Sequence, residues 1–375
     1  MKILFIGPRF HTNLNDRIKA LRDHGHEIKF LSQYKGSIEK YNIISPVVIE
    51  SSIIYSFLEK VREIIYGNNP KDLWKLNLAY PKLKVLKDEI TSYHPDIIIV
   101  KGMKSLLSLF SLYFAKKYKI RSFFLVQIDN YYNKGIVNKF FLFIIKKILK
   151  TEKIISEIKY KEDKENDFFS FIPFSVETYD FEKKYFKDNL INIVSVGKFV
   201  KRKGHLTMLE AINKIKNNFS ISLTIIGQKV DSSVFEEINN YIVDNGLEDI
   251  VNIVYDIDNN KVFDIYKNSD LFVLPSYNEP AAYSILEAMS CKLPVISSDE
   301  NGTSFMVEDG VNGFIFRSKN YIDLSQKIIN IIKDKQGLIY MGQNSFKIAR
   351  DKYSNDIFVK KFNLLIKNKN EKNLF

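Results

Sequence analysis

Two kinds of apolar pattern alternate along most of the chain. Short continuous apolar runs, such as 97–100 and 271–274, predict strands that are buried on both faces. Between such runs, segments such as 205–217 and 321–334 carry apolar residues at helical spacing. Strands that alternate with helices indicate parallel sheets joined by right-handed crossovers. We therefore expect an α/β protein built from doubly wound, Rossmann-like sheets.

The alternation falls into two sets, which predicts two domains facing a cleft. The first set occupies residues 1–172, although residues 33–80 interrupt it with short apolar runs that indicate inserted helices and loops. The second set runs from 191 to 354, and the segment 173–190 between the sets is expected to be a linker. A final amphipathic helix at about 355–375 is expected to pack back on the first domain.

The segment LFVLPSYNEPAAYSILEAMSCKLPVI, residues 271–296, predicts a strand, a loop, a helix from Ala281 and a second strand. Its loop lies at the carboxyl end of a strand, where α/β sheets bind ligands. The first amides of the helix, from Ala281 to Tyr283, would favour an anion such as a phosphate. Glu279 in the loop and Glu287 in the helix could accept hydrogen bonds from hydroxyls or stabilise developing positive charge. A phosphate with hydroxyls indicates a nucleotide sugar; the alternative is an ordinary βαβ unit with solvated glutamates.

A basic loop follows the first strand expected in the second domain. It reads Gly-Lys-Phe-Val-Lys-Arg-Lys-Gly over 197–204. Gly197 permits a tight turn, and Lys198 and Lys203 bracket the loop so that both could face one diphosphate. The alternative is a solvated lysine-rich turn. The Asp-Ile-Asp sequence at 256–258 is also interpreted as a turn, so no metal site is expected.

Composition narrows the possible partners. The 375 residues include one cysteine, which excludes an intramolecular disulfide and a multi-cysteine zinc site. The net charge of +12 favours phosphorylated substrates or anionic lipid. No nucleic-acid-binding motif supports a nucleic-acid partner. No signal peptide and no stretch of membrane-spanning length is visible, so we expect a cytoplasmic protein.

The densest apolar and basic segment is NKFFLFIIKKILKTEK, residues 138–153. It has two compatible interpretations. A core helix could pack on its sheet with its lysines facing water, as the strand-like KIIS at 153–156 favours. At the edge of the domain, the same helix could also lie on an anionic membrane surface, which would make the protein peripheral to the inner face of the membrane.

These motifs resemble those of family 4 retaining glycosyltransferases, which have the GT-B fold. The resemblance is specific over about 191–318 and diffuse over 1–170. Seven residues lie between Glu279 and Glu287, and Ala-Met follows Glu287, as in the family's hallmark motif. The family's Gly-Arg-Leu-x-x-x-Lys-Gly is matched over 197–204, with Lys198 in place of arginine.

The resemblance implies roles for residues of the second domain. Lys198 and Lys203, on the loop that Gly197 opens, would hold the donor diphosphate. Glu287 would bind the ribose hydroxyls, and Glu279 would lie beside the transferred sugar. The distal phosphate would meet the amides of Ala281, Ala282, Tyr283 and Ser284. The reacting groups would then be Glu279, Lys198 and Lys203, with no cofactor and no metal.

The resemblance also marks departures and an acceptor side. Arg9 and His11 follow the first strand and are expected to face the acceptor, with Gln127 at the end of a later strand. Many family members have histidine at the position of Gln127, and Phe-Gly at the positions of Ala281 and Ala282. These changes affect the surroundings expected for the donor sugar.

The resemblance implies a retaining glycosyltransferase. It would move a sugar from a nucleoside diphosphate sugar to a glycan acceptor, expected to be lipid-linked, in the assembly of a cell-surface polysaccharide such as lipopolysaccharide or capsule. Two alternatives remain at this point. One is a nucleotide-sugar epimerase of the same fold, which would convert the donor alone. The other is a noncatalytic partner subunit, which would bind a donor without transferring its sugar.

Overall fold

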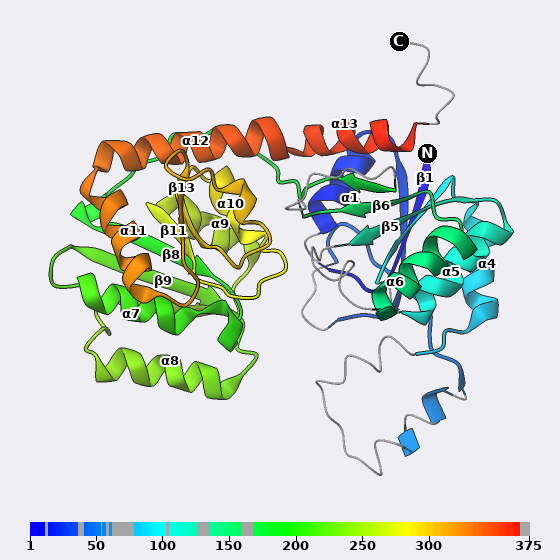
Figure 1. Ribbon diagram of the computed structural model, residues 1–375, viewed down its shortest axis with the longest axis horizontal. Helices are drawn as coiled ribbons and strands as arrows, with labels where there is room; N and C mark the ends of the chain where they lie inside the picture. The colour runs from blue at the N-terminus through cyan, green and yellow to red at the C-terminus, as the bar shows by residue number, and fades with distance from the viewer. Residues whose placement is uncertain are drawn as a thin grey trace. The chain divides into compact units, whose positions relative to one another are not determined.

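The structure, a computed structural model, describes residues 1–11, 14–36, 41–53, 55–57, 60–61, 79–102, 105–126, 136–158 and 168–367. The chain divides into two compact units (Figure 1). The first unit comprises Met1–Pro173 together with Phe358–Phe375, and the second comprises Phe174–Ile357. Gln127, which was expected to face the acceptor, lies outside the described residues.

The first unit contains a seven-stranded sheet in the order β3-β2-β1-β4-β5-β6-β7. All its neighbouring strands pair in parallel. The strands are β1 (Lys2–Arg9), β2 (Glu27–Tyr34), β3 (Val47–Val48), β4 (Ile97–Lys101), β5 (Arg121–Val126), β6 (Lys153–Ser156) and β7 (Phe169–Phe171). The helices are α1 (Asn15–Asp23), α4 (Leu83–Tyr93), α5 (Leu106–Lys117), α6 (Ile136–Phe143), the π-helix η2 (Ile144–Ile148) and α13 (Asn355–Ile366).

Each face of this sheet has its own apolar core, because successive side chains of a buried strand point to opposite faces. One face packs against α4, α5 and η2. The opposite face packs against α1 and also against Phe358, Phe362 and Ile366 of α13. His26 Nε2 lies 3.2 Å from Asn363 Oδ1 and adds a polar contact to the same helix. The last helix therefore belongs to the core of the first unit.

The second unit contains a six-stranded parallel sheet in the order β10-β9-β8-β11-β12-β13. The strands are β8 (Ile191–Val196), β9 (Ile221–Gly227), β10 (Val251–Tyr255), β11 (Leu271–Leu274), β12 (Val295–Ser298) and β13 (Gly313–Phe316). The helices are α7 (His205–Ile215), α8 (Ser232–Asp244), α9 (Asn259–Asn268), α10 (Ser284–Ser290), α11 (Tyr321–Lys333) and α12 (Lys335–Tyr353), with 3₁₀ turns η3 (Lys187–Asn189), η4 (Lys201–Lys203) and η5 (Ser304–Met306).

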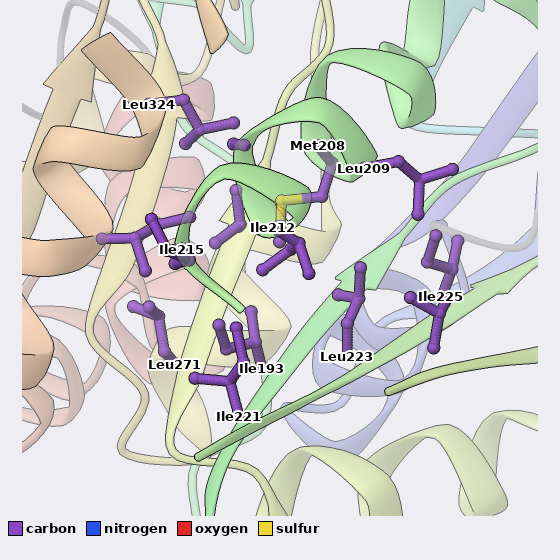
Figure 2. Close-up of a cluster of buried hydrophobic side chains, with 14 of the residues drawn as sticks. Ile193, Met208, Leu209, Ile212, Ile215, Ile221, Leu223, Ile225, Leu271 and Leu324 are labelled. Atoms are coloured by element: carbon purple, nitrogen blue, oxygen red, sulfur yellow. The ribbon is translucent and has the colours of Figure 1, made fainter. Parts of the chain in front are cut away.

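Apolar cores also cover both faces of the second sheet. Figure 2 shows one of them, where Met208 and Ile212 of α7 pack over Ile193 and Leu223 of the sheet. The other core lies under α9 and α10 and includes Tyr266, which is completely buried. Helices on both faces leave the carboxyl ends of the strands as the edge where loops can form a site.

The α/β class and the two parallel sheets are confirmed. One boundary prediction was wrong, because α10 begins at Ser284 and not at Ala281. The segment 173–190 carries Phe174 and Val176 into the core of the second unit. No helix in the described part of the chain is long and apolar enough to cross a membrane.

Candidate functional site

The loop after β8 is held in place by contacts that its residues make with α8 and with the loop after β11. Phe199 is completely buried, and its ring packs edge-on against Phe235 with centroids 5.0 Å apart. Gly204 has φ +67°, and a Cβ there would collide with the carbonyl of Pro275. The amide of Tyr277 donates to the carbonyl of Arg202 at 2.8 Å. The basic loop is therefore fixed against the loop that follows β11.

The loop after β11 is fixed in turn by the loop after β12. The amide of Glu279 donates to the carbonyl of Glu300 at 3.2 Å, and the carbonyl of Glu279 accepts from the amide of Gly302 at 2.9 Å. Asn278, with φ 47°, also donates its amide to Glu300 Oε2 at 3.2 Å. These bonds fix the backbone of Glu279 and so limit the directions in which its side chain can point.

Glu279 points into the basic loop. Its side chain is only 5% exposed, and Oε2 lies 2.7 Å from Lys203 Nζ. Arg202 Nη1 forms an ion pair with the same oxygen. Burial lowers the pKa of Lys203, while the carboxylate of Glu279 opposes this by raising it. Two cations thus meet one buried carboxylate at the carboxyl ends of β8 and β11.

Glu287 lies in the first turn of α10 and is half-buried. Its Oε2 accepts a hydrogen bond of 3.3 Å from the hydroxyl of Tyr266, which belongs to α9. Burial raises the pKa of Tyr266 well above its usual range, and the neighbouring carboxylate raises it further. Tyr266 therefore stays a donor and orients Glu287. Sequence analysis did not identify Tyr266, because nothing in the spacing of α9 marks it.

The segment 281–283 is a loop held by hydrogen bonds, and it does not form the first turn of α10. The amide of Ala282 donates to Thr303 Oγ1 at 3.1 Å, so that amide already has a partner. The hydroxyl of Tyr283 donates to the carbonyl of Ser175 at 2.6 Å. Thr303 is completely buried, and its hydroxyl donates a hydrogen bond of 2.9 Å to Asn301 Oδ1. Sequence analysis missed Thr303, which determines the shape of this loop.

The remaining candidates are distributed over both units. Lys198 is exposed at the start of the basic loop, and Ser284 is the first residue of α10. In the first unit, Arg9 Nε lies 3.5 Å from His11 Nε2, so the end of β1 does bring these two side chains together. No cluster of three or more His, Cys, Asp or Glu side chains suited to a metal occurs among the residues that the structure describes.

This second-unit geometry can be compared with known proteins. The sequence profile of the family described as "Glycosyl transferases group 1" matches residues 177–348. The match lies within the second unit of the chain. The matched residues include Glu279, Glu287 and the basic loop.

Parts of the chain are also similar to curated glycosyltransferases. The capsular polysaccharide biosynthesis glycosyltransferase CapM of Staphylococcus aureus is 27% identical over 192 residues, which is 50% of this chain and 49% of CapM. The N,N'-diacetylbacillosaminyl-diphospho-undecaprenol alpha-1,3-N-acetylgalactosaminyltransferase of Campylobacter jejuni is 31% identical over 110 residues, or 28% and 29% of the two chains. The chain spans about half or less of the length of the curated relatives it matches.

Solved glycosyltransferase structures match both units. The crystal structure of HepE of Anabaena in complex with UDP has a TM-score of 0.73 at 16% identity, with 98% of this chain and 99% of that chain covered. A glycosyltransferase of Rickettsia africae also has a TM-score of 0.73, at 17% identity and 97% coverage of each chain. At these identities the similarity shows the fold, and the two parallel sheets are those of GT-B glycosyltransferases.

Proposed function

We propose that the protein is a retaining glycosyltransferase that moves a hexose or amino sugar from a nucleoside diphosphate sugar to a glycan acceptor. The observation that carries this proposal is the contact of Glu279 with Lys203 and Arg202. A buried carboxylate held by two cations marks a place that an anion can occupy. A donor diphosphate would take these cations, and Glu279 would then be released toward the transferred sugar.

The chemistry that we propose needs few protein groups. The bond between the anomeric carbon and the diphosphate breaks, and the acceptor oxygen bonds to the same face of that carbon. The proton of the acceptor hydroxyl passes to the leaving diphosphate. Lys203 and Arg202 stabilise the charge that develops on the leaving group, and Glu279 stabilises the positive charge that develops on the sugar ring. Catalysis is then mainly positioning and charge stabilisation.

Glu287 is proposed to bind the ribose of the donor. The hydroxyl of Tyr266 donates one hydrogen bond to Glu287 Oε2. A carboxylate can accept several hydrogen bonds, which suits the two hydroxyls of a ribose. Lys198, at the exposed start of the basic loop, is proposed to contact the diphosphate from its outer side. Support for a UDP-sugar donor comes from HepE, whose crystal structure contains UDP.

The acceptor is proposed to be lipid-linked and part of cell-surface polysaccharide assembly. The names of the two relatives support this, since one refers to capsule biosynthesis and the other to a diphospho-undecaprenol substrate. The surface at α6 and η2 gives independent support. Phe140, Phe143 and Ile148 are 60%, 54% and 46% exposed, and Lys146 and Lys147 lie between them in sequence. Apolar side chains beside lysines suit an anionic membrane surface.

The decisive experiment is a transfer assay with a panel of UDP-sugars and lipid-linked glycan acceptors. The variant Glu287→Gln should lower kcat/KM for the donor about ten- to 150-fold, since a hydrogen bond to a charged group contributes about 1.5–3 kcal/mol. The control is Glu236→Gln, at an exposed position of α8. Unchanged transfer in Glu287→Gln would refute the ribose assignment. A new sugar formed from the donor without acceptor would favour an epimerase instead.

A further inference from the structure

A lysine of the first unit has a buried charge that no contact described so far accounts for. Lys101 is the last residue of β4, and its carbonyl accepts from Ser108 Oγ at 2.7 Å. Its Nζ atom is buried and, in the described part of the chain, has no hydrogen-bond partner. An ammonium group that is removed from water without a partner is strongly unfavourable. Such a group in a folded protein calls for an explanation.

Two cationic side chains also disfavour a charge on Lys101. Arg17 of α1 and Arg9 at the end of β1 are both cationic, and after burial itself they lower the pKa of Lys101, to about 7 in total. The carboxylate of Glu157 follows β6 and is completely buried, but it forms an ion pair with Arg17. Neither oxygen of Glu157 bonds to Lys101. Arg17 and Arg9 therefore both act against a positive charge on Lys101.

The position of the cluster is where a ligand would be expected. Lys101 and Arg9 end adjacent parallel strands, and Glu157 directly follows β6, so all three lie at the carboxyl edge of the sheet. Gly102 has φ +91°, which turns the chain away immediately after Lys101. The hydroxyl of Ser105, at the beginning of α5, is also buried without a partner in the described residues. Three polar groups at this edge, Lys101 Nζ, Ser105 Oγ and Glu157 Oε2, thus have no partner among the residues that the structure describes.

We propose that Lys101, with Arg9 and Arg17, binds a phosphoryl group carried by the acceptor. The inference rests on the proposed function and names a chemical class for its acceptor. Two guanidinium groups and one ammonium group match an anion with three or four acceptor oxygens, whereas a carboxylate has only two. The phosphoryl group supplies the hydrogen-bond acceptor that Lys101 lacks, and its negative charge offsets the effect of Arg17 and Arg9. A lipid-linked acceptor carries phosphoryl groups at the junction of its lipid and its glycan.

The first test measures anion binding to the full chain by thermal shift and calorimetry, with inorganic phosphate as the probe at pH 7. Lys101→Met should weaken phosphate binding at least tenfold. In phosphate-free buffer the same variant should melt no earlier than wild type, because methionine fills the space without a charge. The matched control is Lys84→Met, at an exposed position of α4, which should bind phosphate as wild type does. Equal phosphate binding by wild type and Lys101→Met would overturn the proposal.

A second test uses wild type alone and does not depend on the folding of a variant. Sulfate is the probe, because its charge is constant over the range. A bound anion favours the protonated form of Lys101. At a pH above the pKa of Lys101 in the anion-free protein, anion binding is therefore accompanied by the uptake of a proton. The affinity should therefore fall as pH rises above 7, by up to about tenfold for each pH unit. Arg9 and Arg17 are the charged groups that act on Lys101, and Glu157 pairs with Arg17. An affinity that is constant from pH 6 to 8.5 would overturn the proposal.

A third arm distinguishes a phosphoryl group on an acceptor from free phosphate. Geranyl diphosphate replaces inorganic phosphate, and its binding should also depend on Lys101. Binding of phosphate without any Lys101-dependent binding of geranyl diphosphate would refute the acceptor assignment. The proposed function is tested separately, by measuring UDP binding to wild type and to Lys203→Met. That variant reports on the second unit, whereas the Lys101-dependent response reports on the first.

Discussion

Lys203 Nζ lies 2.7 Å from Glu279 Oε2, and this ion pair joins the loop after β8 to the loop after β11. The Lys203 side chain is 11% exposed and that of Glu279 is 5% exposed, so water screens the pair little. Arg202 adds a second cation from the solvent side, where it is 43% exposed. A diphosphate that binds here has to compete with Glu279 for these cations, which couples donor binding to the position of the carboxylate.

Lys203→Met should destabilise the protein and weaken donor binding together. Removal of one partner leaves a buried carboxylate with Arg202 alone, and breaking a buried pair costs about 3 kcal/mol. Urea denaturation followed by circular dichroism measures the loss. Lys201→Met, at an exposed position of the same loop, should change stability by no more than about 0.5 kcal/mol. The double variant Lys203→Met/Glu279→Gln should recover part of the loss, and no recovery would contradict the pairing.

Thr303→Val should loosen the loop between Glu279 and Glu287. Valine has the same shape but cannot accept the hydrogen bond from the amide of Ala282, which then stays buried without a partner. An orphaned buried donor costs about 1–3 kcal/mol, so a clear fall in Tm is expected. Thr303→Ser keeps the hydroxyl and should retain most of the stability. A Tm equal to wild type in Thr303→Val would mean that the hydroxyl does not hold the loop.

His205 should make the second unit sensitive to acid. Burial lowers the pKa of His205 to about 4, although its contact with the carbonyl of Lys198 opposes this, and Lys203 lowers it further. Between pH 4 and the ordinary value near 6.5 the unfolded chain binds the proton and the folded chain does not. Stability is thus fully present above about pH 6.5 and falls by up to about 3 kcal/mol as pH drops to 4.

The check is the pH dependence of urea denaturation for wild type and His205→Gln. The variant lacks the titrating ring, so its stability should fall less between pH 6.5 and 4. Carboxylates titrate in both proteins and cancel in the difference. Parallel curves for the two proteins would show that His205 does not contribute.

The α6–η2 surface should bind anionic vesicles. The double variant Phe140→Ser/Phe143→Ser removes two exposed rings and should reduce sedimentation with phosphatidylglycerol vesicles, while high salt should weaken binding of the wild type. Val243→Ser, at a position 61% exposed on α8, is the control and should bind as wild type does. Equal sedimentation of the double variant and the control would exclude this surface.

Local pattern was enough for most of the fold. The runs at 153–156 and 271–274 form strands with those bounds, because an apolar run between polar loops has few other ways to be buried. The last helix also begins at Asn355, where the sequence predicts it. The start of α10 was misjudged because Pro280 and two alanines suit a helical turn locally. Thr303, from another loop, holds Ala282 outside the helix.

The sequence by itself determined which side chains stand at the ends of strands, since the order of strands and loops follows from the apolar pattern. It placed Glu279, Lys203 and Arg9 at such ends, and Glu287 in the helix that follows Glu279. Only the tertiary structure decided their partners: Glu279 meets Lys203 and Arg202, Glu287 meets Tyr266, and Lys101 Nζ is buried without a hydrogen-bond partner among the described residues. The physical reason is that a periodic pattern reports burial along one segment, whereas an ion pair or an unpaired charge depends on segments far apart in the chain.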